Sequence, residues 1–293
     1  MQTQAKTKAD DSKYIRRGLF LASPQMLGSW EDELARMNAG KRGGQYEYPD
    51  SLIQFAANVK DYSGMASRVV EGFLLGLSAY VPNVKRCDHT TLCRRINEFS
   101  KALKNRGGFT IAIDSSGLTP ARKGGWLAFK HRKKQPYVKI HLAIDVRDGK
   151  ILEFKVTPDT VHDGQVLPEL VKGAGKRARV KKVLADGAYD DKDLDSAVKD
   201  EGGKLVTPPR RNSRVKRKPP PNAVLRNDRV REYKKLGKKK WKKKYGYGKR
   251  WAVETVYSNW KRLFGEGLSA RGPKGVEAEA RRKVFLLNRF LAL

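Results

Sequence analysis

The sequence has few cysteines and no long hydrophobic run. Only Cys87 and Cys93 occur in 293 residues, so a disulfide framework is excluded and we expect a reducing compartment. With His89 they suggest zinc, but no second ligand pair follows at the distance typical of a zinc finger. No run of eighteen apolar residues occurs, and the first residues, MQTQAKTKADDSKY, lack a signal peptide's apolar core. We therefore expect a cytoplasmic protein with no membrane partner.

Acidic residues are also scarce. The chain has 31 Asp and Glu against 63 Lys and Arg, which gives a formal net charge of +32 and a pI near 10.2. The mutual repulsion of so many positive charges is costly without a polyanionic partner, and nucleic acid is the commonest such partner. Hydrophobic residues make up 39% of the chain, which is enough for a folded core and excludes a wholly disordered basic tail. The charge thus indicates a class of partner but not an activity.

The first third of the chain reads as helical. Residues 1–50 form a polar segment with a short helix expected around 28–37, and residues 51–105 show three helical patterns. The second pattern begins at Ser63, and the third has Asp88 as a candidate N-cap. This third helix carries Arg94 and Arg95, so two interpretations stay open: a helix-turn-helix that binds DNA, or a small bundle with a solvated basic face. The residues expected to face its core are Leu92, Ile96, Phe99 and Leu103.

From residue 107 onward the patterns alternate between strand and helix. GFTIAIDSSG predicts a strand that stops at Asp114, and YVKIHLAIDVRDGKILEFKVTP predicts a hairpin. A helix, a strand ending at Asp186, a second helix and a last short strand follow. This order predicts an α/β fold, a mixed sheet flanked by helices.

A basic insertion at 210–246 interrupts this alternation. Residues 210–250 hold nineteen Lys or Arg against two acids, a net charge of +17. We expect an arm that contacts DNA, with partial helix near 225–244 and with Lys238, Lys239 and Lys240 among its contacts; a disordered basic tract is the alternative. Trp241, inside this run, and Trp126, in GGWLAFK, each suit either stacking on DNA bases or packing in a core.

Three carboxylates are candidates for metal chemistry. Asp114 and Asp186 each come at the expected end of an apolar strand, before small turn-forming residues. Glu254 follows Tyr247 and Arg250 in helical register and precedes Lys261, beside a face of Val253, Val256, Tyr257, Trp260 and Phe264 that would pack on the sheet. Three such acids suit a pair of divalent cations acting on a phosphodiester. An ordinary salt bridge between Arg250 and Glu254 is the plainer interpretation of the helix alone.

Other acids compete for this role. We expect Asp145 to lie at a turn, and Asp190 and Asp191 to cap the helix that follows them. Asp163, beside His162 and before a helix, could face the same cleft, although its chemistry suggests no role, and we expect His162 to be structural.

The sequence resembles the DDE transposases of prokaryotic insertion sequences, in the subgroup with the signature Tyr-x2-Arg-x3-Glu-x6-Lys. YGKRWAVETVYSNWK matches all four signature positions, and IAIDSSGL and VLADGAYDD resemble the family's two catalytic Asp segments. The resemblance spans about residues 50–293. It implies an RNase H-like catalytic domain at 107–293, with the basic insertion before the last catalytic helix. The helices at 51–105 match the family's DNA-binding region only loosely.

The resemblance also implies roles for residues. Asp114, Asp186 and Glu254 would be catalytic and would bind two Mg²⁺ ions, for which Mn²⁺ can substitute. Tyr247, Arg250 and Lys261 would hold double-stranded DNA, the element ends and the target. A continuous helix would separate Tyr247 from Lys261 by about 21 Å, so they would contact different points of the strand. Gly246 and Gly248 could instead leave Tyr247 ahead of the helix start.

The implied activity is cleavage at the element ends followed by strand transfer. A homodimer on DNA would bring the two ends together. Two alternatives remain at this stage: an RNase H-like nuclease without strand transfer, and a non-catalytic basic protein that binds nucleic acid.

Overall fold

The computed structural model divides the chain into two compact units. One comprises residues 1–101 with 272–293, and the other comprises residues 102–271. In the parts of the chain that the structure describes, no helix is both long and apolar enough to cross a bilayer. The described residues are 2–22, 29–81, 84–98, 110–120, 137–177, 179–270 and 272–293.

The first unit is helical. The helix α2 matches the one expected around 28–37, and α3 to α5 match the three expected over 51–105, whereas the long α1 lies in a segment for which we expected no such helix. The last helix, α11, packs against α3 and α5, although the sequence led us to include it in the 107–293 domain. The elements are α1 (Gln2–Ala22), α2 (Trp30–Asn38), α3 (Asp50–Ser63), α4 (Ser67–Ser78), α5 (His89–Glu98) and α11 (Pro273–Phe290).

The helix ends in this unit follow from local chemistry. Asp88 caps α5, because its Oδ1 accepts hydrogen bonds from the backbone N–H groups of Thr90 and Thr91 at 2.9 and 3.0 Å; this prediction is confirmed. The expected start of the second helix at Ser63 is wrong. Ser63 instead closes α3, since Gly64 adopts a left-handed conformation with φ of +72° and ends the helix.

The core of the helical unit is apolar, and it contains a buried ion pair between α11 and α3. Leu92 and Ile96 are buried as expected, while Phe99 and Leu103 lie outside the described residues. The Arg282 guanidinium of α11 donates to the Asp61 carboxylate of α3 at 2.8 Å, with both side chains buried. This pair connects two helices that are far apart in the sequence.

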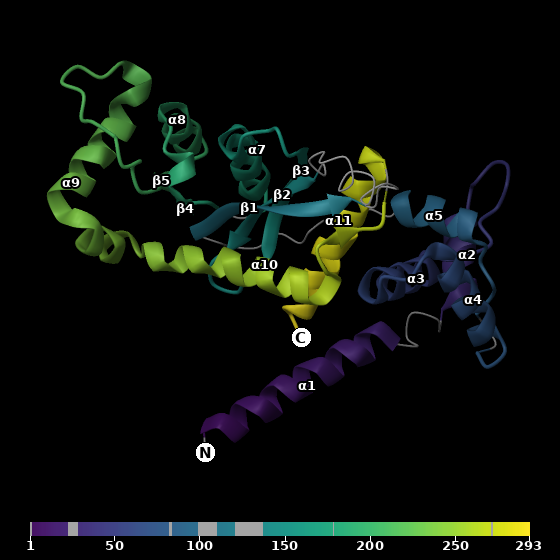
Figure 1. Ribbon diagram of the computed structural model, residues 1–293. Coiled ribbons are helices and arrows are strands. Elements are labelled where there is room, and N and C mark those ends of the chain that lie inside the picture. The colour runs from purple at the N-terminus through teal and green to yellow at the C-terminus, as the bar shows by residue number, and fades with distance from the viewer. Residues whose placement is uncertain are drawn as a thin grey trace, which may run out of the picture. The chain divides into compact units, whose positions relative to one another are not determined.

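The second unit contains the central sheet (Figure 1). Its strand order is β3-β2-β1-β4-β5; β1 to β3 are antiparallel, and β4 and β5 join β1 in parallel. With helices on both faces this is a mixed α/β fold, as the strand and helix patterns predict, and it is consistent with the RNase H-like domain that the resemblance implies. The elements are β1 (Thr110–Pro120), β2 (Val138–Asp145), β3 (Ile151–Pro158), α7 (Asp163–Gly175), β4 (Lys182–Leu184), α8 (Lys192–Asp200), β5 (Lys204–Val206) and β6 (Gly267–Leu268).

The two faces of the sheet carry different helices (Figure 1). Because side chains alternate along a strand, Ile111 and Ile113 of β1 join the apolar core under α7 and α8. Asp114 faces the other side, where α10 (Trp251–Phe264) packs on β1 and β2. The face of α10 that we expected to pack on the sheet buries Val253, Val256, Tyr257 and Trp260.

One boundary of β1 differs from the prediction. The sequence led us to expect a strand that stops at Asp114, but β1 continues to Pro120 and stays paired with β2 as far as Leu118. Backbone pairing with β2 overrides the turn preference of the Ser-Ser-Gly that follows Asp114.

The basic insertion contains the kinked helix α9 (Val224–Tyr245), which confirms the partial helix expected near 225–244. Gly237 interrupts it with φ of +72° and ψ of 160°, so the lysine-rich end takes a new direction. The short 3-10 turn η4 (Tyr247–Arg250) then connects α9 to α10.

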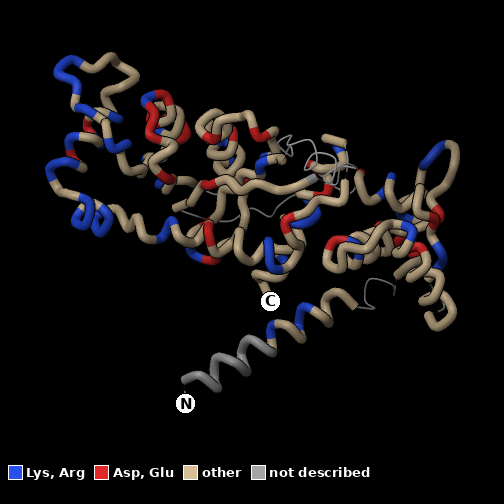
Figure 2. The backbone as a smooth tube through the Cα atoms, viewed as in Figure 1, with Lys and Arg blue, Asp and Glu red and all other residues tan. Residues whose placement is uncertain are grey.

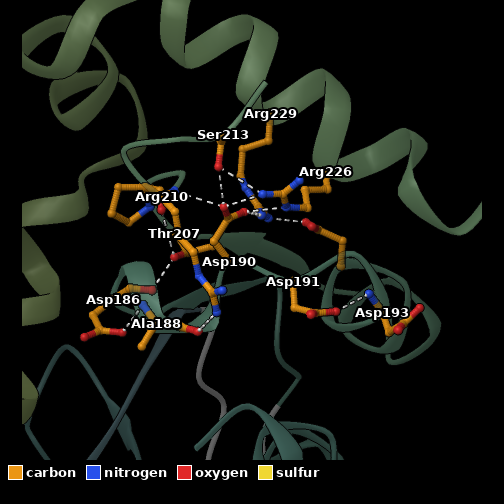
Figure 3. A network of polar contacts seen from close by, with 12 residues as sticks. Asp186, Ala188, Asp190, Asp191, Asp193, Thr207, Arg210, Ser213, Arg226 and Arg229 are labelled. Carbon is orange, nitrogen blue, oxygen red and sulfur yellow. Dashed lines mark hydrogen bonds and ion pairs between the residues drawn. The ribbon is translucent and has the colours of Figure 1, made fainter. Parts of the chain in front are cut away.

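Asp190 binds several residues of this insertion and so holds it against the sheet unit (Figure 3). Its buried carboxylate pairs with Arg226 and Arg229 of α9, each at 2.7 Å. It also accepts hydrogen bonds from the backbone N–H of Arg210 and the Ser213 hydroxyl, both at 2.9 Å. Asp190 is therefore not the helix cap that the sequence suggested. Only Asp191 caps α8, by accepting from the backbone N–H of Asp193.

The donors around Asp190 set its charge state. Burial opposes ionisation, but the hydrogen bonds from Arg226, Arg210 and Arg229 prevail and lower its pKa to about 2. Asp195 shares Arg229, yet burial raises the pKa of Asp195 to about 6 because fewer donors surround it. Asp190 is thus the ionised centre of the network.

We expect Asp190→Ala to lower the free energy of unfolding by about 3–5 kcal/mol, since it leaves the partly buried Arg226 without its counter-charge and the buried Arg229 with Asp195 alone. Guanidinium unfolding followed by tryptophan fluorescence measures this. The control is Asp228→Ala, also on the insertion, which removes a pair with Arg231 that is exposed on both sides and should cost less than about 1 kcal/mol. Equal effects of the two substitutions would contradict the anchoring role.

The same network predicts a pH dependence. The folded pKa of Asp190 lies at about 2, below the value of about 3.9 for an unfolded aspartate. Its stabilisation is therefore complete above about pH 4 and is lost as the pH falls towards 2. The difference in unfolding free energy between the wild type and Asp190→Asn should shrink over that window; a constant difference would refute the assignment.

Candidate active site

Among the described strands, β1 has a partner on one edge only at Asp114. On one side β1 pairs with β2 as far as Leu118, but on the other side its pairing with β4 ends at Ala112 and Leu184. The edge of β1 beyond Ala112 is therefore free of β4. The Asp114 side chain is half-buried beside this opening.

Asp186 occupies the matching position beyond the neighbouring strand, since β4 ends at Leu184 and not at Asp186 as the sequence led us to expect. Asp186 follows Leu184 by two residues, and Asp114 follows Ala112 by two residues. Leu184 and Ala112 are paired with each other. Neighbouring strands lie about 4.8 Å apart, so the two aspartates are brought together. The Asp186 carboxylate accepts the backbone N–H of Ala188 at 2.8 Å, and its carbonyl accepts the Thr207 hydroxyl (Figure 3). The loop that carries Asp186 is thus held from both sides.

Arg250 brings Glu254 to Asp114. Its guanidinium donates to Asp114 Oδ2 at 3.1 Å and also to Glu254 Oε1. The hydroxyl of Tyr257 fixes α10 over the sheet by donating to the backbone carbonyls of Asp114 and Ile140 at 2.8 and 2.9 Å. The Arg250–Glu254 pair that the sequence suggested is present, and it extends to Asp114.

The three acids share one electrostatic environment. Burial raises the pKa of Asp114, and the charges of Asp186 and Glu254 raise it further, against the lowering effect of the Ser115 N–H and of Arg250. A carboxylate disfavoured by like charges is one that a cation would stabilise. Oxygen donors of this kind are those that Mg²⁺ and Mn²⁺ prefer. The donor set therefore fits divalent ions in chemical type.

The arrangement of these side chains is less suited to a metal ion than their chemical type. In the part of the chain that the structure describes, no three Asp, Glu, His or Cys side chains already stand in a metal-holding arrangement. The guanidinium of Arg250 now supplies the positive charge between Asp114 and Glu254.

Two signature residues lie apart from the carboxylates. Tyr247 is not on α10, which begins at Trp251; it belongs to η4, is buried, and donates its hydroxyl to the Ala185 carbonyl at 3.0 Å. Lys261, on the exposed side of α10, pairs with Glu266 at 2.8 Å. Tyr247 therefore lies in the turn ahead of α10 and not on one continuous α-helix with Lys261.

The other residues expected to contact DNA have different surroundings. Lys238, Lys239 and Lys240 are exposed on the kinked end of α9, where basic residues gather (Figure 2). Arg94 is exposed on α5, whereas Arg95 is buried and binds the Asp50 carboxylate at 2.7 Å. Trp126 lies outside the described residues.

The other acids considered for the metal site have surroundings that differ from one another. Asp145 is buried and pairs with Arg147 at 2.6 Å within its turn, which leaves it away from the site. Asp163 begins α7 and accepts hydrogen bonds from Ser115, the neighbour of Asp114, and from Lys139. Sequence reasoning missed the contributions of Ser115 and Lys139, because only the pairing of β1 with β2 brings them to Asp163. The adjacent His162 is exposed.

Comparison with known proteins shows which family the chain belongs to. A family model described as "Transposase DDE domain" matches residues 107–289, and a second model with the same description matches residues 15–121. Among solved structures, a piggyBac transposase synaptic complex with hairpin DNA is similar at 11% identity over 95% of this chain and 74% of that one. Its TM-score of 0.39 is too low to support a functional argument. Since the first model covers more than half of the chain, the protein belongs to the family of transposases with a DDE domain.

Proposed function

We propose that this transposase cleaves DNA at the ends of an insertion sequence and joins the freed ends to target DNA by a two-metal mechanism. The observation that supports the proposal is that Arg250 bonds to both Asp114 and Glu254, while Asp186 lies at the matching position beyond the neighbouring strand β4. The four-position signature in YGKRWAVETVYSNWK supports the insertion-sequence subgroup.

The proposed roles follow from position. Asp114, between the other two acids, would contact both ions, while Asp186 and Glu254 would each complete one site. Two such ions, when bound, supply an activated water or 3′-hydroxyl and stabilise the leaving oxygen. Mg²⁺ is the expected ion, and Mn²⁺ shares its ligand preference.

The protein's own groups would position the DNA strand. Arg250 contacts both Asp114 and Glu254 and would be the cation nearest the reacting phosphate, while Lys261 is about three turns further along the chain. Tyr247 is buried against Ala185, so we assign it the support of the Asp186 strand rather than direct contact with DNA.

The lysine-rich end of α9 is the proposed DNA-binding arm. Trp241 is buried among Tyr233, Tyr245 and Tyr247, with ring centroids 5.2 to 5.5 Å from its own. It therefore anchors the arm instead of stacking on a base. This anchor leaves the lysines on either side exposed to a DNA backbone. Arg94 on α5 is a further proposed contact, whereas Arg95 is already paired.

We expect Asp114→Ala, Asp186→Ala and Glu254→Ala each to abolish Mg²⁺-dependent cleavage of the DNA that borders the element, because each removes an ion ligand. The assay incubates the full chain with that DNA, with and without Mg²⁺, and follows cleaved and joined products separately. Asp148→Asn, an exposed acid in the same unit, should cleave as the wild type does.

The products distinguish the alternatives. Cleavage with joining supports the transposase. Cleavage without joining would indicate a nuclease on the same core, and cleavage that survives the three substitutions would refute the catalytic assignment.

Replacing Lys238, Lys239 and Lys240 together with alanine should weaken DNA binding to a similar degree for every sequence. It should also reduce the slope of log affinity against log salt by up to about 2.7, which corresponds to about 0.9 for each lost phosphate contact. Fluorescence anisotropy at several salt concentrations measures both effects.

A matched variant controls for net charge. This control replaces Lys172, Lys176 and Lys192 with alanine. These lysines are exposed on or next to α7 and at the start of α8. Their loss removes the same charge and should leave the slope nearly unchanged. An arm variant with the wild-type slope would show that this segment does not contact phosphates.

A further inference from the structure

Asp163 is the acid near the active site for which the proposed mechanism has no role. It lies at the first residue of α7, on the face of the sheet opposite to Asp114. Its Oδ2 accepts the Ser115 hydroxyl at 2.8 Å and its Oδ1 accepts the Lys139 ammonium at 3.1 Å. Asp163 is thus bound to two strands, β1 and β2.

Strand register explains how these residues meet. Asp114 and Ser115 are consecutive on β1, so their side chains point to opposite faces of the sheet. Ser115 is paired with His141, and Lys139 lies two residues before His141 on the same face. The start of α7 covers this face, where the Lys139 ammonium also donates to the Val161 carbonyl at 2.9 Å.

Ser115 connects this network to Asp114. While its hydroxyl binds Asp163, its backbone N–H donates to Asp114 Oδ1 at 2.9 Å. The other oxygen of Asp114 is held by Arg250. The orientation of the Asp114 carboxylate therefore depends on how firmly Ser115 is fixed.

We propose that Asp163 is a positioning residue that fixes the Asp114 carboxylate through Ser115. The proposal rests on the function proposed above, in which Asp114 contacts both ions. Lys139 holds Asp163 in place, Asp163 holds the Ser115 hydroxyl, and the Ser115 N–H orients Asp114. Groups that orient metal ligands in this way typically contribute about 10- to 100-fold to metal affinity or activity.

The test measures Mn²⁺ binding to the full chain by titration calorimetry, together with the Mg²⁺ concentration for half-maximal cleavage. Asp163→Ala and Ser115→Ala should each weaken Mn²⁺ binding about 10-fold. Because both act on one chain of contacts, the double variant should lie within about twofold of the weaker single variant. Asp163→Asn keeps an acceptor for Ser115 but loses the charge pair with Lys139, so its loss should be smaller.

Glu169→Ala is the matched control on the same helix. Glu169 pairs with Lys155 at the surface, and its removal should leave Mn²⁺ affinity unchanged. Thermal unfolding of each variant separates positioning from support of the fold. A lower Tm of Asp163→Ala with wild-type Mn²⁺ affinity would overturn the proposal, and so would additive losses in the double variant. If Asp163→Ala does not fold, Ser115→Ala alone decides, since it removes only one hydroxyl.

This result is distinguishable from failure of the proposed function. If the wild type cleaves and Asp114→Ala abolishes both cleavage and Mn²⁺ binding, the function stands whatever Asp163 does. If Asp114→Ala leaves both intact, the proposed function and this inference fail together.

Discussion

The site depends on the unequal pairing of one strand. β1 is paired with β2 along most of its length but with β4 over three residues only. Beyond the end of β4 one edge of β1 is no longer paired with β4, and Asp114 and Asp186 lie at matching positions there. Asp114 therefore lies on a strand that β2 holds on one edge, beside the edge that β4 leaves unpaired. The helix α10 then brings Arg250 and Glu254 over the same point.

Charge is balanced locally in a protein with a large positive excess. Each acid near the site has a cationic or hydrogen-bonding partner: Arg250 for Asp114 and Glu254, and Lys139 for Asp163. Asp190 applies the same chemistry to the fold, since it holds two arginines of the insertion against the sheet. The excess lysines lie outside these pairs, on the exposed end of α9, which suits an arm for a polyanion.

The predictions that rested on periodicity agree with the structure, and those that rested on local turn preference do so less often. The apolar face of α10, the order of the strands and the cap at Asp88 follow from spacing and short-range hydrogen bonds. The end of β1 at Asp114 and the start of a helix at Ser63 were wrong, because pairing with β2 and a left-handed Gly64 decide those boundaries. Asp190 resembles a helix cap in sequence, and its arginine partners more than thirty residues away could not be inferred from spacing.

The sequence by itself determined the class of partner, the order of the elements and the types of side chain available for chemistry, since charge and periodicity are local properties. It also identified Asp114, Asp186 and Glu254 as candidates. Only the tertiary structure decided that Arg250 connects two of them, that Tyr247 and Arg95 are buried, and that Ser115 binds Asp163. These contacts join residues from different elements, and strand register and helix packing set their distances.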